Sequence, residues 1–175
     1  IGMFVDVPDV TGAVGGTLSL HGPVYDLDGE GHLALAGVNL WGERFDEGHA
    51  HGFMDAGLFT LDDLQVTRNS AREGLWVRGS IDREWALNME VLADGLALER
   101  LDVLADSQIP VAGNLAMHAR LGNTLFDPAP AGLLTASDVR YAGFELEDSR
   151  ILFETTDQVV RASAVVVGGA ATAEA

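Results

Sequence analysis

Apolar and polar residues alternate along almost the whole chain, in short runs separated by Gly, Asp and Asn. A period of two points successive side chains of an extended strand to opposite faces, so each run has one apolar and one polar face. The polar face carries residues such as Thr17, Asn88, His118 and Glu154. The apolar positions of the clearest runs are Leu18, Leu20, Leu33, Leu35, Leu75, Val77, Trp85, Leu87, Met89, Val91, Leu115, Met117, Ala119, Leu121, Ile151 and Phe153.

Turn-forming pairs separate these runs. Asp28-Gly29, Asp94-Gly95, Gly122-Asn123 and Ala142-Gly143 are typical of turns, since they combine residues that tolerate positive φ or favour turns. Strands this close in sequence favour antiparallel pairing, because a parallel crossover needs a dozen or more residues. The pattern therefore predicts an all-β protein with roughly a dozen mostly antiparallel strands.

Two stretches depart from this pattern. Residues 93–104 also fit helical spacing, but Gly95 weakens a helix there, and we predict two strands, Leu96–Leu98 and Leu101–Val103. Residues 168–175 are small and featureless, which predicts a tail or linker. We expect residues 1–167 to form a single repetitive β-sheet segment of a longer protein.

Two parts of the chain have similar sequences. The motif GTLSLH at 16–21, followed by VNLWG at 38–42, returns as GNLAMH at 113–118, followed by VRYAG at 139–143. The offset of about a hundred residues exceeds the period of typical solenoid repeats. A sheet that grows by adding strands without closing would show such an internal sequence similarity.

These motifs resemble a known family. Four short motifs follow one another along the chain: Gly-x-Leu-x-Leu-x-Gly, Gly-x-Leu-x-Leu, Val-x-Leu/Tyr-x-Gly and, at Leu75–Gly79, Leu-x-Val-x-Gly. This succession is similar to that of the AsmA-like and TamB-like envelope proteins of Gram-negative bacteria. The segment GNLAMHARLGNTLFDPAPAGLLTASDVRYAGFELED is especially like their repeats, and the resemblance covers about residues 15 to 154. Their membrane anchor and partner-binding region have no counterpart in this chain, so those contacts are not carried over.

The resemblance implies a long, curved, mostly antiparallel sheet, a β-taco or open half-barrel with an apolar concave face, standing in the periplasm. It also implies phospholipid transport between the inner and outer membranes, or outer-membrane protein assembly. The expected partners are phospholipid or an unfolded outer-membrane protein client, neighbouring repeats, and an Omp85-type outer-membrane protein. No cofactor is expected.

An acyl chain gains roughly 25 cal/mol for each Å² of apolar surface it buries, so such a groove needs shape and apolar lining and no special residue. The candidate lining is Leu18, Leu20, Leu33, Leu35, Leu75, Val77, Leu87, Met89, Val91, Leu115, Met117, Leu121, Ile151 and Phe153. The alternative is that these residues form the closed core of a sandwich or barrel. In that case the chain is a secreted or surface structural module, such as a stalk or adhesin.

Charge and composition narrow the choice of partners. The net charge of −17 repels a phosphate backbone, which argues against nucleic acid. The absence of Cys excludes disulfides and thiolate metal sites.

Polar motifs give little indication of chemistry. His49 and His51, with Glu47 and Asp55, offer possible metal ligands, but the flanking glycines are typical of an exposed turn and we predict no metal site. The start of a calcium loop at Asp26-Leu-Asp28-Gly-Glu30 has Gly37 where a bidentate Glu is needed.

Catalytic motifs are equally weak. The acidic pairs at Asp62-Asp63 and around Glu145 have no spacing that makes them converge, and no Gly-x-Ser-x-Gly elbow occurs. We therefore expect no enzyme; an acidic all-β hydrolase is the least favoured alternative.

Overall fold

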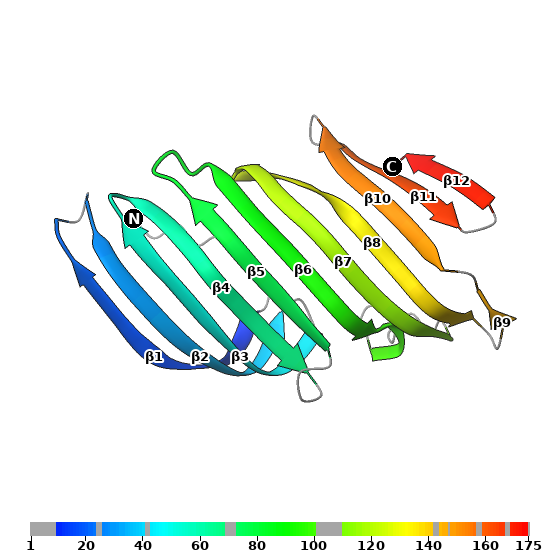
Figure 1. The fold of residues 1–175 in the computed structure, drawn as a ribbon, viewed down its shortest axis with the longest axis horizontal. Coiled ribbons are helices and arrows are strands. Elements are labelled where there is room, and N and C mark those ends of the chain that lie inside the picture. Colours follow the sequence, from blue (N-terminus) through cyan, green and yellow to red (C-terminus); the bar gives the residue numbers. More distant parts are fainter. Residues whose placement is uncertain are drawn as a thin grey trace.

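A computed structural model describes residues 10–23, 26–40, 43–68, 73–100, 110–141, 144–146, 148–156, 159–166 and 169–174. Nearly all of them lie in strands (Figure 1). The strands are β1 (Val10–His21), β2 (Asp28–Leu40), β3 (Glu43–Asp55), β4 (Leu58–Arg68), β5 (Glu73–Ile81), β6 (Leu87–Ala97), β7 (Val111–Thr124), β8 (Asp127–Tyr141), β9 (Phe144–Glu145), β10 (Ser149–Thr156), β11 (Val159–Val166) and β12 (Gly169–Glu174). A short 3-10 helix, η1, covers Leu98–Arg100, and no helix in these ranges is long and apolar enough to cross a bilayer.

The strands form one open sheet. Its order is β1-β2-β3-β4-β5-β6-β7-β8-β10-β11-β12, and β9 pairs with β8 beside this path (Figure 1). Every pairing is antiparallel, because short connections bring each strand back along its predecessor. Within the described ranges β1 and β12 stand at opposite edges and do not close a barrel. The prediction of an all-β, mostly antiparallel, long open sheet is confirmed.

Bulges interrupt the register and bend the sheet. Extra residues occur in β2 at Gly37, in β4 at Asp62, in β6 at Gly95 and in β8 at Asp138. Gly37, Gly95 and Asp138 have φ of 58°, 65° and 53°, the left-handed conformation that many bulges require. A bulge increases the local twist and bends its strand, so these positions give the sheet its curvature.

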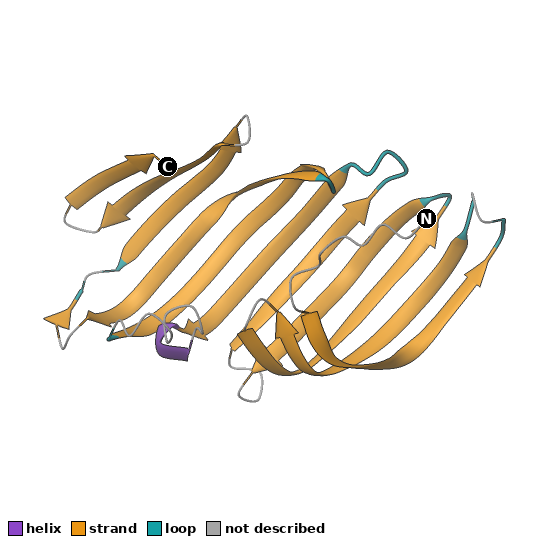
Figure 2. Cartoon of the chain, turned by 180° about the vertical axis from the view of Figure 1, so that it is seen from behind, coloured by secondary structure: helices purple, strands orange, loops and turns teal. Residues whose placement is uncertain are grey.

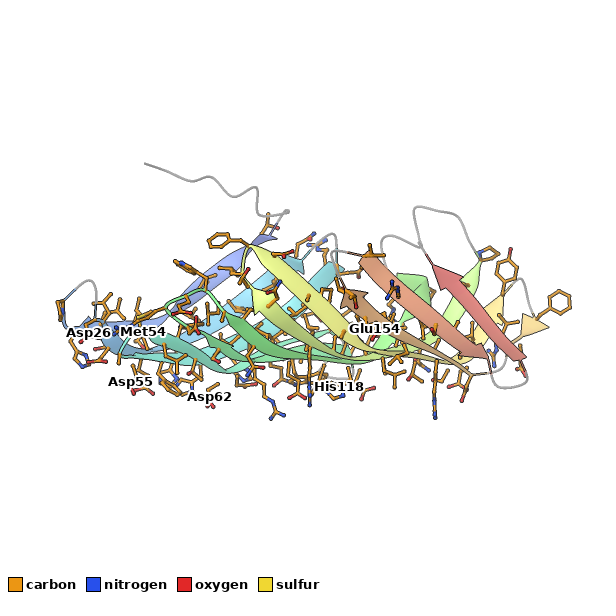
Figure 3. The ribbon with its side chains drawn as sticks, turned by 90° about the horizontal axis from the view of Figure 1, so that it is seen from above. Asp26, Met54, Asp55, Asp62, His118 and Glu154 are labelled. Carbon is orange, nitrogen blue, oxygen red and sulfur yellow. The ribbon has the colours of Figure 1, made fainter. Side chains whose placement is uncertain are left out.

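The Val10 end of β1, the Leu40 end of β2 and the Glu43 end of β3 lie side by side and curl over one face of the sheet (Figures 2 and 3). Val38 of β2 and Phe45 of β3 are buried in a cluster with Val66 of β4, which is only 1% exposed. Leu35, Leu75 and Leu96 pack against this cluster. The curled ends thus cover one end of the apolar face with residues of the same chain.

An ion-pair group holds the curled end in place. The Arg68 guanidinium lies 3.0 Å from a Glu43 carboxylate oxygen and 5.2 Å from the centre of the Phe45 ring. Glu73 lies between Arg68 and Arg100, 2.7 Å from the latter. These charges tie the start of β3 to the end of β4, the start of β5 and the short helix η1.

Several predicted turns are wrong. Asp28-Gly29 begins β2, and Asp94-Gly95 forms a bulge inside β6. Gly122-Asn123 lies within β7, which ends at Thr124, and the turn itself is Leu125-Phe126. A Gly next to a polar residue suits a bulge as well as a turn, so the dipeptide alone did not distinguish them. Ala142-Gly143 lies outside the described residues.

Two predicted segment boundaries also need correction. Gly169–Glu174 forms β12, not a tail, because the edge of β11 supplies backbone hydrogen-bond partners irrespective of side-chain size. The predicted strand Leu96–Leu98 is the end of β6 followed by η1, since Leu98 starts the 3-10 turn. The predicted strand Leu101–Val103 lies outside the described residues.

Candidate hydrophobic binding face

Register places every predicted groove residue on the same face of the sheet. Directly paired residues of neighbouring strands point to the same side. From Leu33, the successive partners are Ala50, Leu64, Val77, Val91 and Ala119. A parallel row two residues away runs through Leu35, Gly48, Val66, Leu75, Ala93, Met117, Leu134 and Ile151. A third row contains Leu18, Gly31, Gly52, Leu61, Gly79, Met89 and Leu121. A fourth row contains Leu20, Gly29, Met54, Phe59, Ile81 and Leu87.

The remaining predicted residues extend these rows. Leu115 pairs with Leu96 beyond the β6 bulge, and Phe153 pairs with Gly132, the partner of Ala119. This apolar face is the concave one, over which the strand ends curl (Figure 3). Asp55, Asp62 and His118 lie along the opposite, convex side of the sheet (Figure 3).

The solvent exposure of the side chains differs sharply from one part of the apolar face to another. At the N-terminal edge Leu18 is 69% exposed, Leu20 49% and Leu33 39%. At the centre Leu87 and Met89 are each 8% exposed, and the other predicted residues are half-buried. The uncovered part of the face is therefore the end of β1–β4 away from the curled strand ends.

A hollow of about 300 Å³ lies in this uncovered part. Its apolar lining includes Leu18, Leu20, Leu33, Met54, Phe59 and Leu61, around Gly29, Gly31 and Gly52. A Cβ atom at Gly31 would lie 3.1 Å from Leu18 Cδ1, and one at Gly52 would lie 3.3 Å from the Phe59 ring. Glycine at these positions keeps the space between the large side chains open.

The convex face carries a group of imidazoles and carboxylates on β2, β3 and β4. His51 Nε2 lies 2.9 Å from Glu30 Oε1, and His51 Nδ1 lies 3.2 Å from Asp62 Oδ2. His32 Nε2 is 3.1 Å from the same Glu30 oxygen. His49 Nε2 is 2.6 Å from Asp63 Oδ2.

These contacts shift two pKa values in opposite directions. The hydrogen bond to Glu30, followed by that to Asp62, raises the pKa of His51 above 6.5. Hydrogen bonds from His51 and then from His32 lower the pKa of Glu30 below 4.5. Both shifts follow from placing a cation and carboxylates next to one another, which favours the charged form of each.

A second convex group lies on β5, β6 and β7. Glu90 is 2.8 Å from His118 Nε2 and 2.6 Å from Arg78 Nε. The hydrogen bond from His118, followed by that from Arg78, lowers the pKa of Glu90 below 4.5. These paired charges keep the convex face hydrated while the opposite face stays apolar.

The structure corrects the predicted surroundings of the two histidines. His49 and His51 lie within β3, not in a turn, and contact Asp63 and Asp62 of β4 and Glu30 of β2. The extra residue of the β4 bulge lets the adjacent Asp62 and Asp63 both reach the convex face. These carboxylates, and not those of Glu47 and Asp55, are the hydrogen-bond partners of the two imidazoles in the described part of the chain.

Other candidate residues have structural roles. Asp28 accepts a hydrogen bond from the Ala56 backbone N–H, and Asp26 pairs with Arg83. Glu145 in β9 pairs with Arg140. Sequence reasoning missed His32 altogether; the spacing Glu30-x-His32 beside His49-x-His51 was the available signal, but its use required the β2–β3 register.

No protein-family model, curated protein or solved structure matches this chain.

Proposed function

We propose that this chain is a hydrophobic-groove segment of the AsmA-like and TamB-like kind, which holds phospholipid acyl chains in the periplasm of a Gram-negative bacterium. In this proposal it passes lipid between the inner and outer membranes as part of a longer protein. The observation that carries the proposal is the continuous concave apolar face, uncovered around Leu18, Leu20 and Leu33. Large exposed apolar patches on a protein surface usually mark binding sites.

The chemistry of the face suits an acyl chain. Each buried CH₂ group contributes about 0.8 kcal/mol, without any directional contact. The rows of Leu, Val, Met and Phe offer such burial. Glu30 and His51 also border the hollow, but their side chains meet each other on the convex side of the sheet. A lipid head group would stay in water at the rim, so the proposal assigns neither catalysis nor a cofactor to this face.

A specific observation also favours the second candidate function, the guidance of an unfolded outer-membrane protein. Strand β1 forms a sheet edge of 12 residues, Val10–His21, and all its described side chains from Thr11 onward are exposed. Among the described residues no strand pairs with the outer side of β1, and a free edge of this length can accept another strand by backbone pairing. Such pairing would serve a client strand, a neighbouring repeat or an Omp85-type partner.

If the chain were a secreted or surface structural module, its own residues would fill the core. The curled ends of β2 and β3 do cover Val66, but Leu18 and Leu20 at the other end have no such cover among the described residues. Exposing these leucines to water is unfavourable in a stalk that binds nothing.

Lipid extraction tests the proposal. The chain is purified from a Gram-negative host without detergent, extracted with organic solvent, and the phospholipid per protein is quantified by mass spectrometry. The Leu18→Arg variant places a charge on the apolar face, and Thr17→Arg places the same charge on the opposite face of the same exposed strand.

We expect phospholipid with the unaltered chain and with Thr17→Arg, and at least a several-fold loss with Leu18→Arg. All three proteins should fold, because exposed substitutions usually change stability by within about 0.5 kcal/mol. A folded, lipid-free unaltered chain would support the structural module, and equal lipid in both variants would show that the apolar face does not bind it.

A further inference from the structure

Three potential metal ligands meet on the convex face, on the side of the sheet opposite the apolar hollow that Glu30 and His51 also border. Glu30 and His32 come from β2 and His51 from β3. Their nearest ligand atoms, one from each residue, all lie within 4.8 Å of one another. Both imidazoles direct Nε2 toward the same carboxylate oxygen of Glu30, at 3.1 Å and 2.9 Å.

The sheet register places these three side chains next to one another. His32 and His51 are direct cross-strand partners, and their rings stack with centroids 4.3 Å apart and planes inclined by 10°. Glu30 lies two residues before His32 and so points to the same face. Both strands are paired on each side, β2 with β1 and β3 with β4, which limits their movement.

The surroundings of His51 match those of a metal-binding histidine. Its Nδ1 lies 3.2 Å from Asp62 Oδ2, which leaves Nε2 facing Glu30 and His32. Metal-ligating histidines almost always donate the other ring N–H to a carboxylate, a carbonyl or water, which fixes the ring orientation. Asp62 reaches this place because the β4 bulge puts it on the same face as Asp63.

The two distances from imidazole nitrogen to the Glu30 oxygen are close to those between two ligands of one metal ion. Zn²⁺ binds His nitrogen at ~2.0–2.1 Å and carboxylate oxygen at ~2.0–2.2 Å, so two ligands of a tetrahedral site are ~3.4 Å apart. The Nε2–Oε1 separations of 2.9 Å and 3.1 Å are slightly shorter than this, and the two imidazole rings, now stacked with planes inclined by 10°, have to tilt toward each other so that both Nε2 lone pairs meet at the ion. The net charge of −17 also favours cations over anions at this surface.

We propose that Glu30, His32 and His51 form a divalent transition-metal site, best suited to Zn²⁺, with Asp62 orienting His51. Two nitrogens and one oxygen are a common zinc ligand set, and a fourth position remains for water at this exposed site. The ion joins β2 to β3 on the side opposite the hollow. This site does not depend on the proposed lipid binding.

Calorimetric titration of the metal-free full chain with ZnCl₂ at neutral pH tests the site. We expect one Zn²⁺ per chain, with at least tenfold weaker binding in His32→Ala and in His51→Ala. Asp62→Asn should weaken binding by roughly tenfold, the usual effect of losing an outer carboxylate. His118→Ala is the matched control, because His118 also contacts a glutamate on the convex face but is not part of the three-ligand group.

Co²⁺ added in place of Zn²⁺ gives a second readout through its visible absorption, which should appear in the unaltered chain and be lost in His51→Ala. Circular dichroism confirms that each variant is folded. No Zn²⁺ binding by the unaltered chain, or an equal loss in His118→Ala and His51→Ala, would overturn the proposal. Since lipid extraction is a separate measurement, failure here leaves the groove proposal standing on its own result.

Discussion

Gly31 and Gly15 are matched glycines on opposite faces of the first two strands. Gly31 lies on the concave face in the hollow, opposite Leu18, whereas Gly15 pairs with Ala34 and points to the convex face. Neither has a left-handed φ, and no atom lies within 4 Å of a Cβ built on Gly15. Substitution of each therefore separates the effect of filling the hollow from that of adding bulk to the sheet.

Gly31→Leu should lower the amount of bound phospholipid several-fold, because its side chain occupies the space between Leu18 and the neighbouring strands. Gly15→Leu should leave lipid binding unchanged. The measurement is the lipid-to-protein ratio after extraction, with thermal unfolding as a check on stability. Equal lipid content in the two variants would contradict the assignment of the hollow.

Glu90 gives a second residue-scale prediction. His118→Ala removes the contact that contributes most to the lowered pKa of Glu90, so this pKa should rise toward 4.5, with Arg78 keeping part of the shift. Carbon-detected NMR titration of the Glu90 carboxyl group measures it. An unchanged Glu90 pKa would show that the His118 contact is not formed in solution.

The same shift has a consequence for stability. Because the folded-state pKa of Glu90 lies below its unfolded value of 4.5, its stabilisation is present above pH 4.5. That stabilisation is lost as the pH falls through the folded-state pKa. His118→Ala should therefore reduce stability at neutral pH more than at strongly acidic pH.

At the scale of residues, alternation was enough to predict which side chains share a face. Leu18 and Met89 were both assigned correctly to the apolar side by their period of two. Their exposures of 69% and 8% were not predictable, because they depend on distance from the sheet edge and on the curled strand ends. The grouping of Glu30, His32 and His51 likewise depends on register, which a single sequence does not specify.

At the scale of elements, bulges decide the shape of this sheet. Gly37 has φ of 58° in β2, where the strand bends toward the curled end, and a Cβ built there meets no atom within 4 Å. A substitution at Gly37 therefore tests backbone strain without a steric clash.

Gly37→Ala should destabilise the fold by about 1–2 kcal/mol, the cost of a left-handed conformation for an L-residue with a side chain. Gly122→Ala in β7 is the control, since Gly122 is equally open and has no left-handed φ; its stability should be unchanged or up to about 1 kcal/mol higher. Urea unfolding measures both. Equal stability of the two variants would argue against a strained bulge at Gly37.

The elements also show where sequence patterns stop being informative. Runs such as Leu87-x-Met89-x-Val91 identify strands because a helix, with its period of 3.6, would not place these residues on one face. Asp94-Gly95 was predicted as a turn and is a bulge, because both structures accept a glycine with positive φ. Strand β12 was not predicted because its small residues carry no alternation, and its pairing with β11 supplies the backbone hydrogen bonds.

At the scale of the whole molecule, a single open sheet separates an apolar concave face from a charged convex face. The curled ends of β1–β3 cover one end of the concave face, and the other end remains open. The two edges of the described sheet, β1 and β12, allow it to continue into neighbouring segments. In the proposed function such continuation lengthens the groove, while the metal site belongs to the convex face alone.

Photo-crosslinking along β1 tests the central claim most directly. A benzophenone amino acid is placed in turn at Thr17, Leu18, Ser19 and Leu20, and crosslinked phospholipid is measured by mass spectrometry. All four positions are exposed, so accessibility to solvent does not distinguish them. We predict crosslinks at Leu18 and Leu20 and none at Thr17 and Ser19. Equal crosslinking at all four positions, or none at any, would contradict an apolar face that binds lipid.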